Sequence, residues 1–309
     1  MRKLALLVIL CSANAFTEGR AGREVIYTLI SKVVPTLDKG YLIEYPGGPS
    51  ADVTLVRPDG TLAYTARVVP PDGAGVIVGN GAVDRDGTLA VGVGYEGPDG
   101  FAGGIAWFDS GGKQIRFVST GRYVPLQLSY GADHSLWATG GQRDAVLRHH
   151  ADSQDYMIFR KYSPEGKEVG AYLPRSAFPR GLEPGSCGHG SWHLRVAKDR
   201  IGALVRSGKT SLNLEWVELD LSGNLIGRWN VGSLTRLQGE AFTESGNLYA
   251  LVFQEDNFTL RVLNRETGGF DAVDFDVPSG LGFLLGADGD NLVFHFQTPG
   301  RFRWVAAAR

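Results

Sequence analysis

The sequence predicts an all-β fold of repeated antiparallel sheets, and a short hairpin pattern is the first observation behind that prediction. Residues 81–94 (GAVDRDGTLAVGVG) contain a strand, a turn with Asp84, Asp86 and Gly87, and a second strand. Asp side chains hydrogen-bond nearby backbone amides in turns, and glycine adopts the positive φ that tight hairpin turns require. The two strands are therefore expected to run antiparallel.

The second strand of this hairpin has two different faces. Bulky and small residues alternate along it, with Leu89, Val91 and Val93 on one face and Ala90, Gly92 and Gly94 on the other. Successive side chains of a strand point to opposite faces of its sheet. We expect both faces to be buried, and the small residues to let a neighbouring sheet approach closely.

The hairpin recurs along the chain at a nearly constant spacing. The first apolar residue after each turn marks the copies, which are Leu42, Leu89, Leu136, Ile201, Leu248 and Leu292. These markers lie 47, 47, 65, 47 and 44 residues apart. Such a period is typical of a solenoid, a propeller or another repeat array. The sequence therefore predicts six copies of one structural unit.

Each copy also carries a second hairpin. An apolar strand, a Gly-containing turn and another strand follow the first hairpin in residues 104–118, 159–173, 215–229 and 260–275. Four strands per repeat at this spacing are typical of propeller blades, and no segment with the helical period interrupts them. The predicted fold is a six-bladed β-propeller with four antiparallel strands per blade.

The two ends of the chain complement each other. The last copy supplies three strands, at residues 282–286, 291–296 and 301–305, whereas the strand at residues 24–30 precedes the first copy without a partner. We expect the N-terminal strand to complete the last blade and close the ring, because closure removes two exposed strand edges.

The order of motifs within a blade resembles a known group of propellers. Residues 81–118 read as apolar strand, Asp-x-Asp-Gly, strand, aromatic-Asp-x-x-Gly, strand. This order resembles the six-bladed propellers of the NHL and SMP-30-like type. The resemblance covers nearly all of the chain after its leader and implies a single propeller domain over residues 16–309.

Residues 1–15 are expected to be a cleaved signal peptide. Arg2 and Lys3 precede the apolar run at residues 4–11, and Ala13 and Ala15 supply the small residues of a cleavage site. This order is typical of secretory leaders, and the apolar run is too short to cross a membrane. A lipoprotein with lipid on Cys11 is the alternative, although Leu10 stands where a small residue is expected. We expect a secreted or periplasmic protein.

Charge and cysteine content narrow the range of partners. Loss of Arg2 and Lys3 with the leader changes the formal net charge from −2 to −4. A weakly acidic surface does not favour binding to nucleic acid or to an anionic membrane. Only Cys187 remains after cleavage at Ala15, so an intramolecular disulfide is excluded. We expect a monomer without a transmembrane segment.

The one break in the period indicates where ligands bind. The interval between Leu136 and Ile201 contains two insertions, at residues 140–155 and 174–191. In an up-and-down blade these two connections emerge on the same face, where the central channel opens. Long loops on a rigid scaffold commonly carry binding function. The candidate ligand-binding residues are Arg143, Arg148, His149, His150, Asp152, Arg180, Glu183 and Trp192.

The same insertions, and the start of the strand that follows residue 191, contain candidate metal ligands. Cys187, His189 and His193, with His149 or His150, offer imidazole and thiolate groups that bind zinc and other transition metals, and nearby carboxylates could hold calcium. The spacing Cys-x-His-x-x-x-His matches no diagnostic site, and the alternative is that these are solvated loop residues with Cys187 packed beneath them.

No specific catalytic motif is present, so catalytic residues are not assigned. The chain has no nucleophile elbow, no His-Glu-x-x-His and no phosphate-binding loop. SMP-30-like lactonases hold a metal through a Glu, an Asn and an Asp on inner strands, beginning with Glu-Gly-Pro. Here Glu183 stands in Leu-Glu-Pro-Gly, in a loop and in another order, so that site is not carried over.

The sequence therefore favours a module that binds a protein, peptide or glycan through the loop-rich channel face. The alternative is a metal-dependent hydrolase or lyase with its ion over the same channel. Propellers host both kinds of protein, so the fold alone does not choose between them.

Overall fold

The computed structural model describes residues 24–26, 33–36, 41–44, 51–57, 61–71, 74–142, 155–178, 194–207, 213–233, 236–275, 281–296 and 301–306. These residues form six antiparallel four-stranded sheets. The predicted all-β class and the four-stranded repeat are thus confirmed. The described part of the chain contains no helix long and apolar enough to cross a bilayer.

The first three sheets consist of strands that follow one another in the sequence. Sheet 1 contains β2 (Val33–Thr36), β3 (Tyr41–Glu44), β4 (Asp52–Val56) and β5 (Leu62–Arg67). Sheet 2 contains β6 (Ala74–Val83), β7 (Leu89–Gly97), β8 (Gly100–Phe108) and β9 (Gln114–Gly121). Sheet 3 contains β10 (Tyr123–Tyr130), β11 (Leu136–Gln142), β12 (Met157–Tyr162) and β13 (Glu168–Pro174).

The next two sheets repeat this order, and the last one differs at its edge. Sheet 4 contains β14 (Leu194–Val196), β15 (Arg200–Arg206), β16 (Asn213–Asp220) and β17 (Leu225–Ser233). Sheet 5 contains β18 (Leu237–Phe242), β19 (Leu248–Gln254), β20 (Asn257–Asn264) and β21 (Gly269–Ala272). Sheet 6 contains β22 (Leu281–Asp288), β23 (Asn291–Phe296), β24 (Arg301–Ala306) and β1 (Glu24–Ile26).

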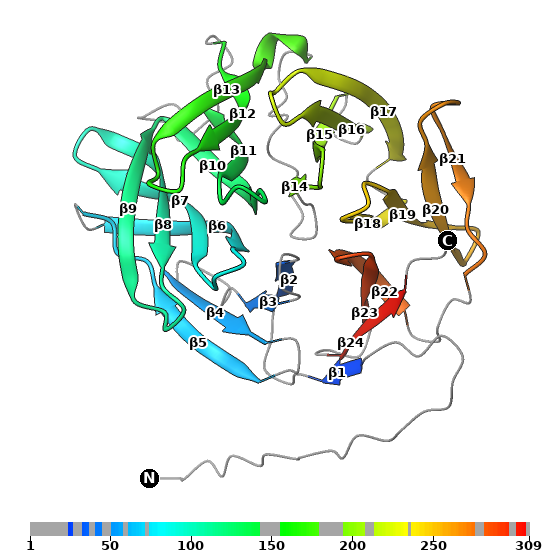
Figure 1. Cartoon of the computed structure of the whole chain (residues 1–309), viewed down its shortest axis with the longest axis horizontal. Helices are drawn as coiled ribbons and strands as arrows, with labels where there is room; N and C mark the ends of the chain where they lie inside the picture. Colours follow the sequence, from blue (N-terminus) through cyan, green and yellow to red (C-terminus); the bar gives the residue numbers. More distant parts are fainter. Residues whose placement is uncertain are drawn as a thin grey trace.

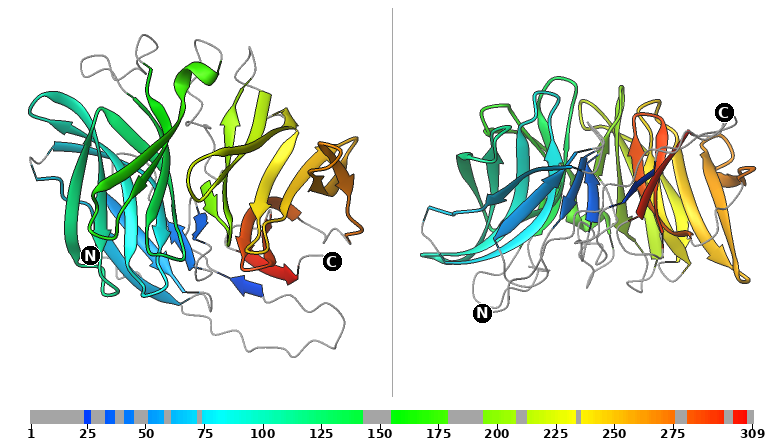
Figure 2. Two further views of the ribbon diagram at one scale, coloured as in Figure 1. Left: turned by 45° about the horizontal axis from the view of Figure 1, so that its top comes forward. Right: turned by 90° about the horizontal axis from the view of Figure 1, so that it is seen from below.

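The sheets succeed one another around a common centre in the order of the sequence (Figure 1). The first strand of each repeat, β2, β6, β10, β14, β18 or β22, lies nearest the centre, as Figure 1 shows. Seen from the side, the sheets stand next to one another and their connections lie at the two ends of the strands (Figure 2). This arrangement is a β-propeller.

The N-terminal strand lies beside the C-terminal strand. β1 pairs antiparallel with β24, and Glu24, Val25 and Ile26 stand opposite Arg303, Phe302 and Arg301. The N-terminal strand β1 is therefore the outermost strand of sheet 6. This agrees with the expectation that it completes the last repeat.

The Asp-rich turn has the predicted chemistry. The Asp84 carbonyl accepts a hydrogen bond from Gly87 N at 2.9 Å, and Asp86 Oδ1 accepts one from Thr88 N at 2.8 Å. Gly87 has a φ of 94°, a value that is strained for residues with a Cβ. These local bonds explain why the same residue types recur at the hairpin turns.

The small face of β7 does let a neighbouring sheet approach closely. A Cβ placed on Gly92 would lie 2.4 Å from the Pro125 carbonyl oxygen of β10. On the opposite face, Leu89, Val91 and Val93 are fully buried against sheet 1. Both faces of this strand are thus covered, as the alternation predicts.

The hydrophobic core lies between the sheets. The described residues form five buried clusters, and each is shared by two consecutive sheets, from sheets 1 and 2 to sheets 5 and 6. Inner strands such as β7 and β19 are therefore almost entirely apolar and buried, because sheets cover both of their faces, whereas outer strands such as β9 and β17 carry polar residues and are half-buried or exposed.

Candidate functional site

The two insertions of sheet 3 start from the same end of its strands. The first joins β11 to β12 and the second joins β13 to β14, so both leave the sheet at the end opposite the β10–β11 turn. We call the end that carries these two insertions the loop-bearing face, and the opposite end, with the β6–β7, β10–β11 and β18–β19 turns, the turn-bearing face. The expected common face of the insertions is confirmed.

The bases of the two insertions are bound to each other. The Asp155 carboxylate, at the end of the first insertion, accepts hydrogen bonds from the backbone N and the hydroxyl of Ser176, at 2.9 and 2.8 Å. Next to them, the Arg175 backbone N donates to the Tyr156 carbonyl at 2.7 Å. The two loops therefore leave the scaffold side by side.

The second insertion is also anchored on sheet 4. Its first described residues form the 3-10 helix η1 (Arg175–Ala177), where the sequence predicts a loop. The buried Phe178 follows this helix. The Arg228 guanidinium of β17 stacks on the Phe178 ring at 4.4 Å and donates to the Ala177 carbonyl at 3.3 Å. Glu215 of β16 orients Arg228 through an ion pair of 2.7 Å.

The eleven candidate residues from the sequence lie in the parts of the insertions that the structure does not describe. Arg143, Arg148, His149, His150 and Asp152 fall between residues 143 and 154, and Arg180, Glu183, Cys187, His189, Trp192 and His193 fall between residues 179 and 193. Their roles in ligand or metal binding stay predictions. Asp155 and Phe178 are described residues at the bases of the two insertions, where Asp155 contacts the second insertion and Phe178 contacts sheet 4.

His134, which is close to the histidine-rich insertions in sequence, lies on the turn-bearing face. Its Nδ1 contacts Asp84 Oδ2 at 2.6 Å, so the turns of sheets 2 and 3 are joined there. This hydrogen bond, together with the attraction of the carboxylate charge, raises the pKa of His134 above its usual value. His134 thus belongs to a contact between sheets and not to the candidate site.

Buried polar groups on the innermost strands of sheets 3 and 5 were missed by the sequence reasoning. Gln127 and Ser129 of β10 and Glu240 of β18 expose 5%, 1% and 1% of their surface. Within the described part of the chain, no hydrogen-bond partner contacts Gln127 Oε1. In the sequence, each of them stands as a polar residue within a largely apolar strand, and this pattern could have identified them. A buried polar group costs free energy unless it has a hydrogen-bond partner.

Two further contacts link the innermost strands to one another. Ser129 Oγ accepts a hydrogen bond from the Val196 backbone N of β14 at 3.1 Å. The Arg195 guanidinium of β14 donates to the Ala287 carbonyl of β22 at 3.1 Å. Arg195 thus connects the innermost strand of sheet 4 with that of sheet 6.

The described residues do not assemble a metal site. No three side chains of His, Cys, Asp or Glu within them come together so that they could hold an ion. Among the buried polar groups of the described innermost strands, Glu240 offers a carboxylate, Gln127 an amide and Ser129 a hydroxyl. The described centre therefore does not fit the metal site that the lactonase resemblance would imply.

No protein-family model matches the sequence, and no curated protein matches it. Similar folds occur among solved structures. A gluconolactonase from Xanthomonas campestris has a TM-score of 0.52 and 15% identity, over 92% of this chain and 89% of its own. A protein from Bacteroides fragilis that is described as exported has a TM-score of 0.53 and 10% identity, over 90% and 86%.

These similarities concern the fold. A virginiamycin B lyase from Staphylococcus aureus also matches, with a TM-score of 0.47 and 12% identity over 94% of this chain and 100% of its own. The two structures with TM-scores above 0.5 support the fold that the sheet topology shows, and at such identities the chemistry of the site has to be argued from its residues.

Proposed function

We propose that the protein is an exported six-bladed β-propeller that binds a protein, peptide or glycan through its loop-bearing face. The observation that carries this proposal is the shared base of the two insertions, where Asp155 of the first holds Ser176 of the second. Paired loops on a rigid scaffold form a surface that can enclose an extended ligand, and scaffold loops commonly bind.

The ring and the leader are part of the same proposal. Six four-stranded sheets, with β1 paired to β24, support six blades closed by the N-terminal strand. The charged, apolar and small-residue order of residues 1–15 supports export with cleavage after Ala15. A protein that leaves the cytoplasm as a monomer would meet its ligand in the periplasm or outside the cell.

The loop residues supply suitable chemistry for such a ligand. Arg143, Arg148 and Arg180 offer donors for carboxylate or phosphate groups, and Trp192 offers a stacking surface for a sugar or an aromatic side chain. Gln127 and Glu240, on the innermost strands β10 and β18, add buried hydrogen-bonding groups at the centre of the propeller.

Replacement of the insertions tests the proposal. Residues 143–154 and 179–193 are exchanged, separately and together, for short Gly-Ser linkers, and the purified proteins are applied to peptide and glycan arrays. The control exchanges residues 208–212, the β15–β16 connection on the same face. We expect wild type and control to retain a common ligand that the double exchange loses. Equal binding by all the proteins would contradict the proposal.

The metal-dependent hydrolase or lyase remains the alternative outcome. Metal content is measured for wild type and for a His189→Ala/His193→Ala variant after dialysis without chelator. Near-stoichiometric zinc or calcium that disappears in the variant would favour the enzyme, and lactone hydrolysis would then be the first assay because one structural neighbour is a gluconolactonase.

A further inference from the structure

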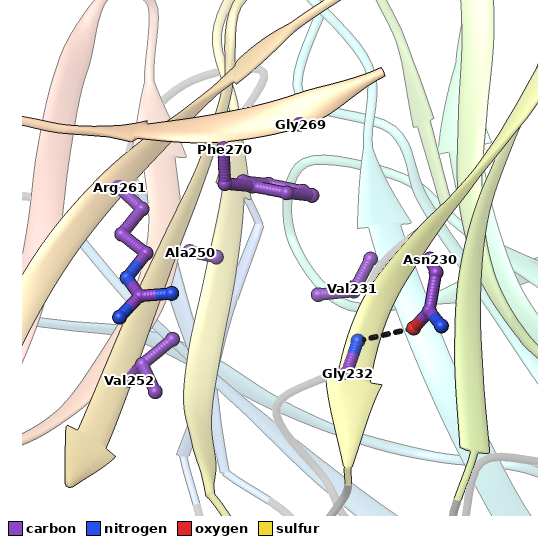
Figure 3. Close-up of a pocket in the computed structure, with 8 residues that line it drawn as sticks. All are labelled: Asn230, Val231, Gly232, Ala250, Val252, Arg261, Gly269 and Phe270. Carbon is purple, nitrogen blue, oxygen red and sulfur yellow. Dashed lines mark hydrogen bonds between the residues drawn. The ribbon is translucent and has the colours of Figure 1, made fainter. Parts of the chain in front are cut away.

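A cavity of about 380 Å³ lies between sheets 4 and 5, and none of its described lining residues belongs to the two insertions. Strand β17 lines one side, and β19, β20 and β21 line the other (Figure 3). This volume is at the lower end of the range for small-molecule pockets.

The short outer strand of sheet 5 helps to explain why the space is open. β21 has four residues, whereas β17, the corresponding strand of sheet 4, has nine. β21 pairs only with residues 261–264 of β20. β21 ends at Ala272, which stands opposite Arg261, and one further backbone hydrogen bond of 2.9 Å joins Val273 N to the Leu260 carbonyl. Within the described residues, the outer strand of sheet 5 thus ends beside the cavity.

The cavity has apolar walls and one cationic group. The apolar side chains are Val231 of β17, Ala250 and Val252 of β19, and Phe270 of β21. Arg261 of β20 is half-buried and its guanidinium reaches toward Val252 in Figure 3. None of the described lining residues is acidic.

Asn230 at the edge of the cavity is held by its own strand. Asn230 Oδ1 accepts a hydrogen bond from the Gly232 backbone N at 2.7 Å (Figure 3). This bond fixes the orientation of the side chain, and the amide nitrogen of Asn230 points away from the other lining residues in Figure 3. The Arg261 guanidinium is therefore the polar group that favours a ligand with acceptor oxygens.

A second arginine of sheet 5 has an anionic partner, in contrast to Arg261. Arg265, directly after β20, binds the buried carboxylate of Glu218 in sheet 4 through two hydrogen bonds of 3.0 and 2.6 Å. By contrast, no ion pair or side-chain hydrogen bond joins Arg261 to another residue in the described ranges. A partly desolvated cation is stabilised when an anion pairs with it, and guanidinium pairs with carboxylate through two parallel hydrogen bonds.

We infer that this cavity binds a small amphipathic carboxylate. The carboxylate pairs with the Arg261 guanidinium, and a short apolar or aromatic portion lies against Val231, Val252 and Phe270. The inference does not depend on the loop-bearing face, because the cavity uses none of the residues of the two insertions.

Matched probes that differ in charge test the inference. Binding of 3-phenylpropionate and of the neutral 3-phenylpropan-1-ol is measured by two-dimensional NMR titration for the wild type, Arg261→Gln and Arg261→Lys. The control is Arg122→Gln, which removes the same charge from an exposed position in the β9–β10 connection. Circular dichroism confirms that each variant is folded.

We expect the wild type to bind the carboxylate at least about tenfold more tightly than the alcohol, because a charged hydrogen-bonded pair contributes more than a neutral one. Arg261→Gln should lose this preference, Arg261→Lys should keep part of it, and Arg122→Gln should match the wild type. Shifts should centre on Val231, Val252 and Phe270. Equal affinity of Arg261→Gln and wild type for the carboxylate, equal affinity of the wild type for both probes, or no saturable binding by the wild type would each overturn the inference.

Discussion

The two faces of the propeller differ in how their connections are held. On the turn-bearing face, tight turns are bound to the neighbouring sheet by side chains, as in the 2.6 Å contact of His134 with Asp84 and the 2.9 Å bond from Ser245 N to Asp290. On the loop-bearing face, Asp155 and Ser176 join two long insertions to each other. The turn-bearing face thus carries contacts between neighbouring sheets, and the loop-bearing face carries the two insertions that we propose to bind a ligand.

A buried ion cluster near the turn-bearing face should give the largest effect on stability. Glu218 is fully buried and accepts hydrogen bonds from Trp216 Nε1, Arg200 and Arg265, the first at 2.9 Å. Glu218→Gln should lower the free energy of unfolding by about 3 kcal/mol, because the fully buried carboxylate is lost and two partly buried guanidinium groups are left without their anion. Urea denaturation measures this difference.

The matched control lies three residues earlier on the same strand. Glu215 pairs with Arg228 but both side chains are partly exposed, so Glu215→Gln should cost at most about 1 kcal/mol. Equal losses for the two variants would contradict the assignment of the buried cluster as the main polar link between sheets 4 and 5.

Close packing between sheets 2 and 3 should give the next largest effect. Gly92→Ala would place a methyl group 2.4 Å from the Pro125 carbonyl oxygen, so the backbones must separate. We expect a loss of about 1 to 3 kcal/mol in thermal denaturation, as for overpacked cores. Gly111→Ala, whose new Cβ would have its nearest neighbour at 3.4 Å, should change stability by less than about 0.5 kcal/mol.

The base of the insertions should show a smaller loss of stability. Asp155→Ala removes both hydrogen bonds to Ser176 and should lower the free energy of unfolding by about 1 kcal/mol. If the insertions form the recognition surface, this variant should also weaken ligand binding. Asp52→Ala, which removes an exposed ion pair with Arg67, should leave binding unchanged.

The smallest expected effect is a dependence of stability on pH at the turn-bearing face. The pKa of His134 is raised in the folded protein by its bond to Asp84. The stabilisation that the charged His134 gives to the folded protein is therefore complete below the ordinary histidine pKa of 6.5. It is lost as the pH rises through the raised pKa of the folded state. Melting temperatures of wild type and His134→Gln, measured from pH 5 to 9, should differ most at the acid end. A constant difference across this range would contradict the role of the charged link.

Much of the fold could be predicted because its signals are local. The turn at Asp84 to Gly87 and the alternation of Leu89, Val91 and Val93 with small residues depend on a few neighbours in the chain. Strand pairing within a hairpin follows from such patterns. The recurrence of the pattern then fixes the kind of architecture.

The candidate site could be predicted less well because its contacts depend on how sheets are placed. Glu218 meets Arg265, and His134 meets Asp84, only when two sheets stand at a particular rotation, which no local pattern encodes. The cavity at Arg261 depends on the early end of β21. Gln127 is different, since a polar residue within an apolar inner strand was visible in the sequence.

The pairing of β1 with β24 has a consequence for the order of assembly. Sheets 1 to 5 join strands that are adjacent in the sequence, so each can pair as soon as its own segment exists. Sheet 6 instead needs Glu24 beside Arg303, and the entropy of closing so long a loop opposes this contact until the intervening sheets are compact. A ribosome-bound chain would therefore hold its first strand unpaired until synthesis of the last one is complete.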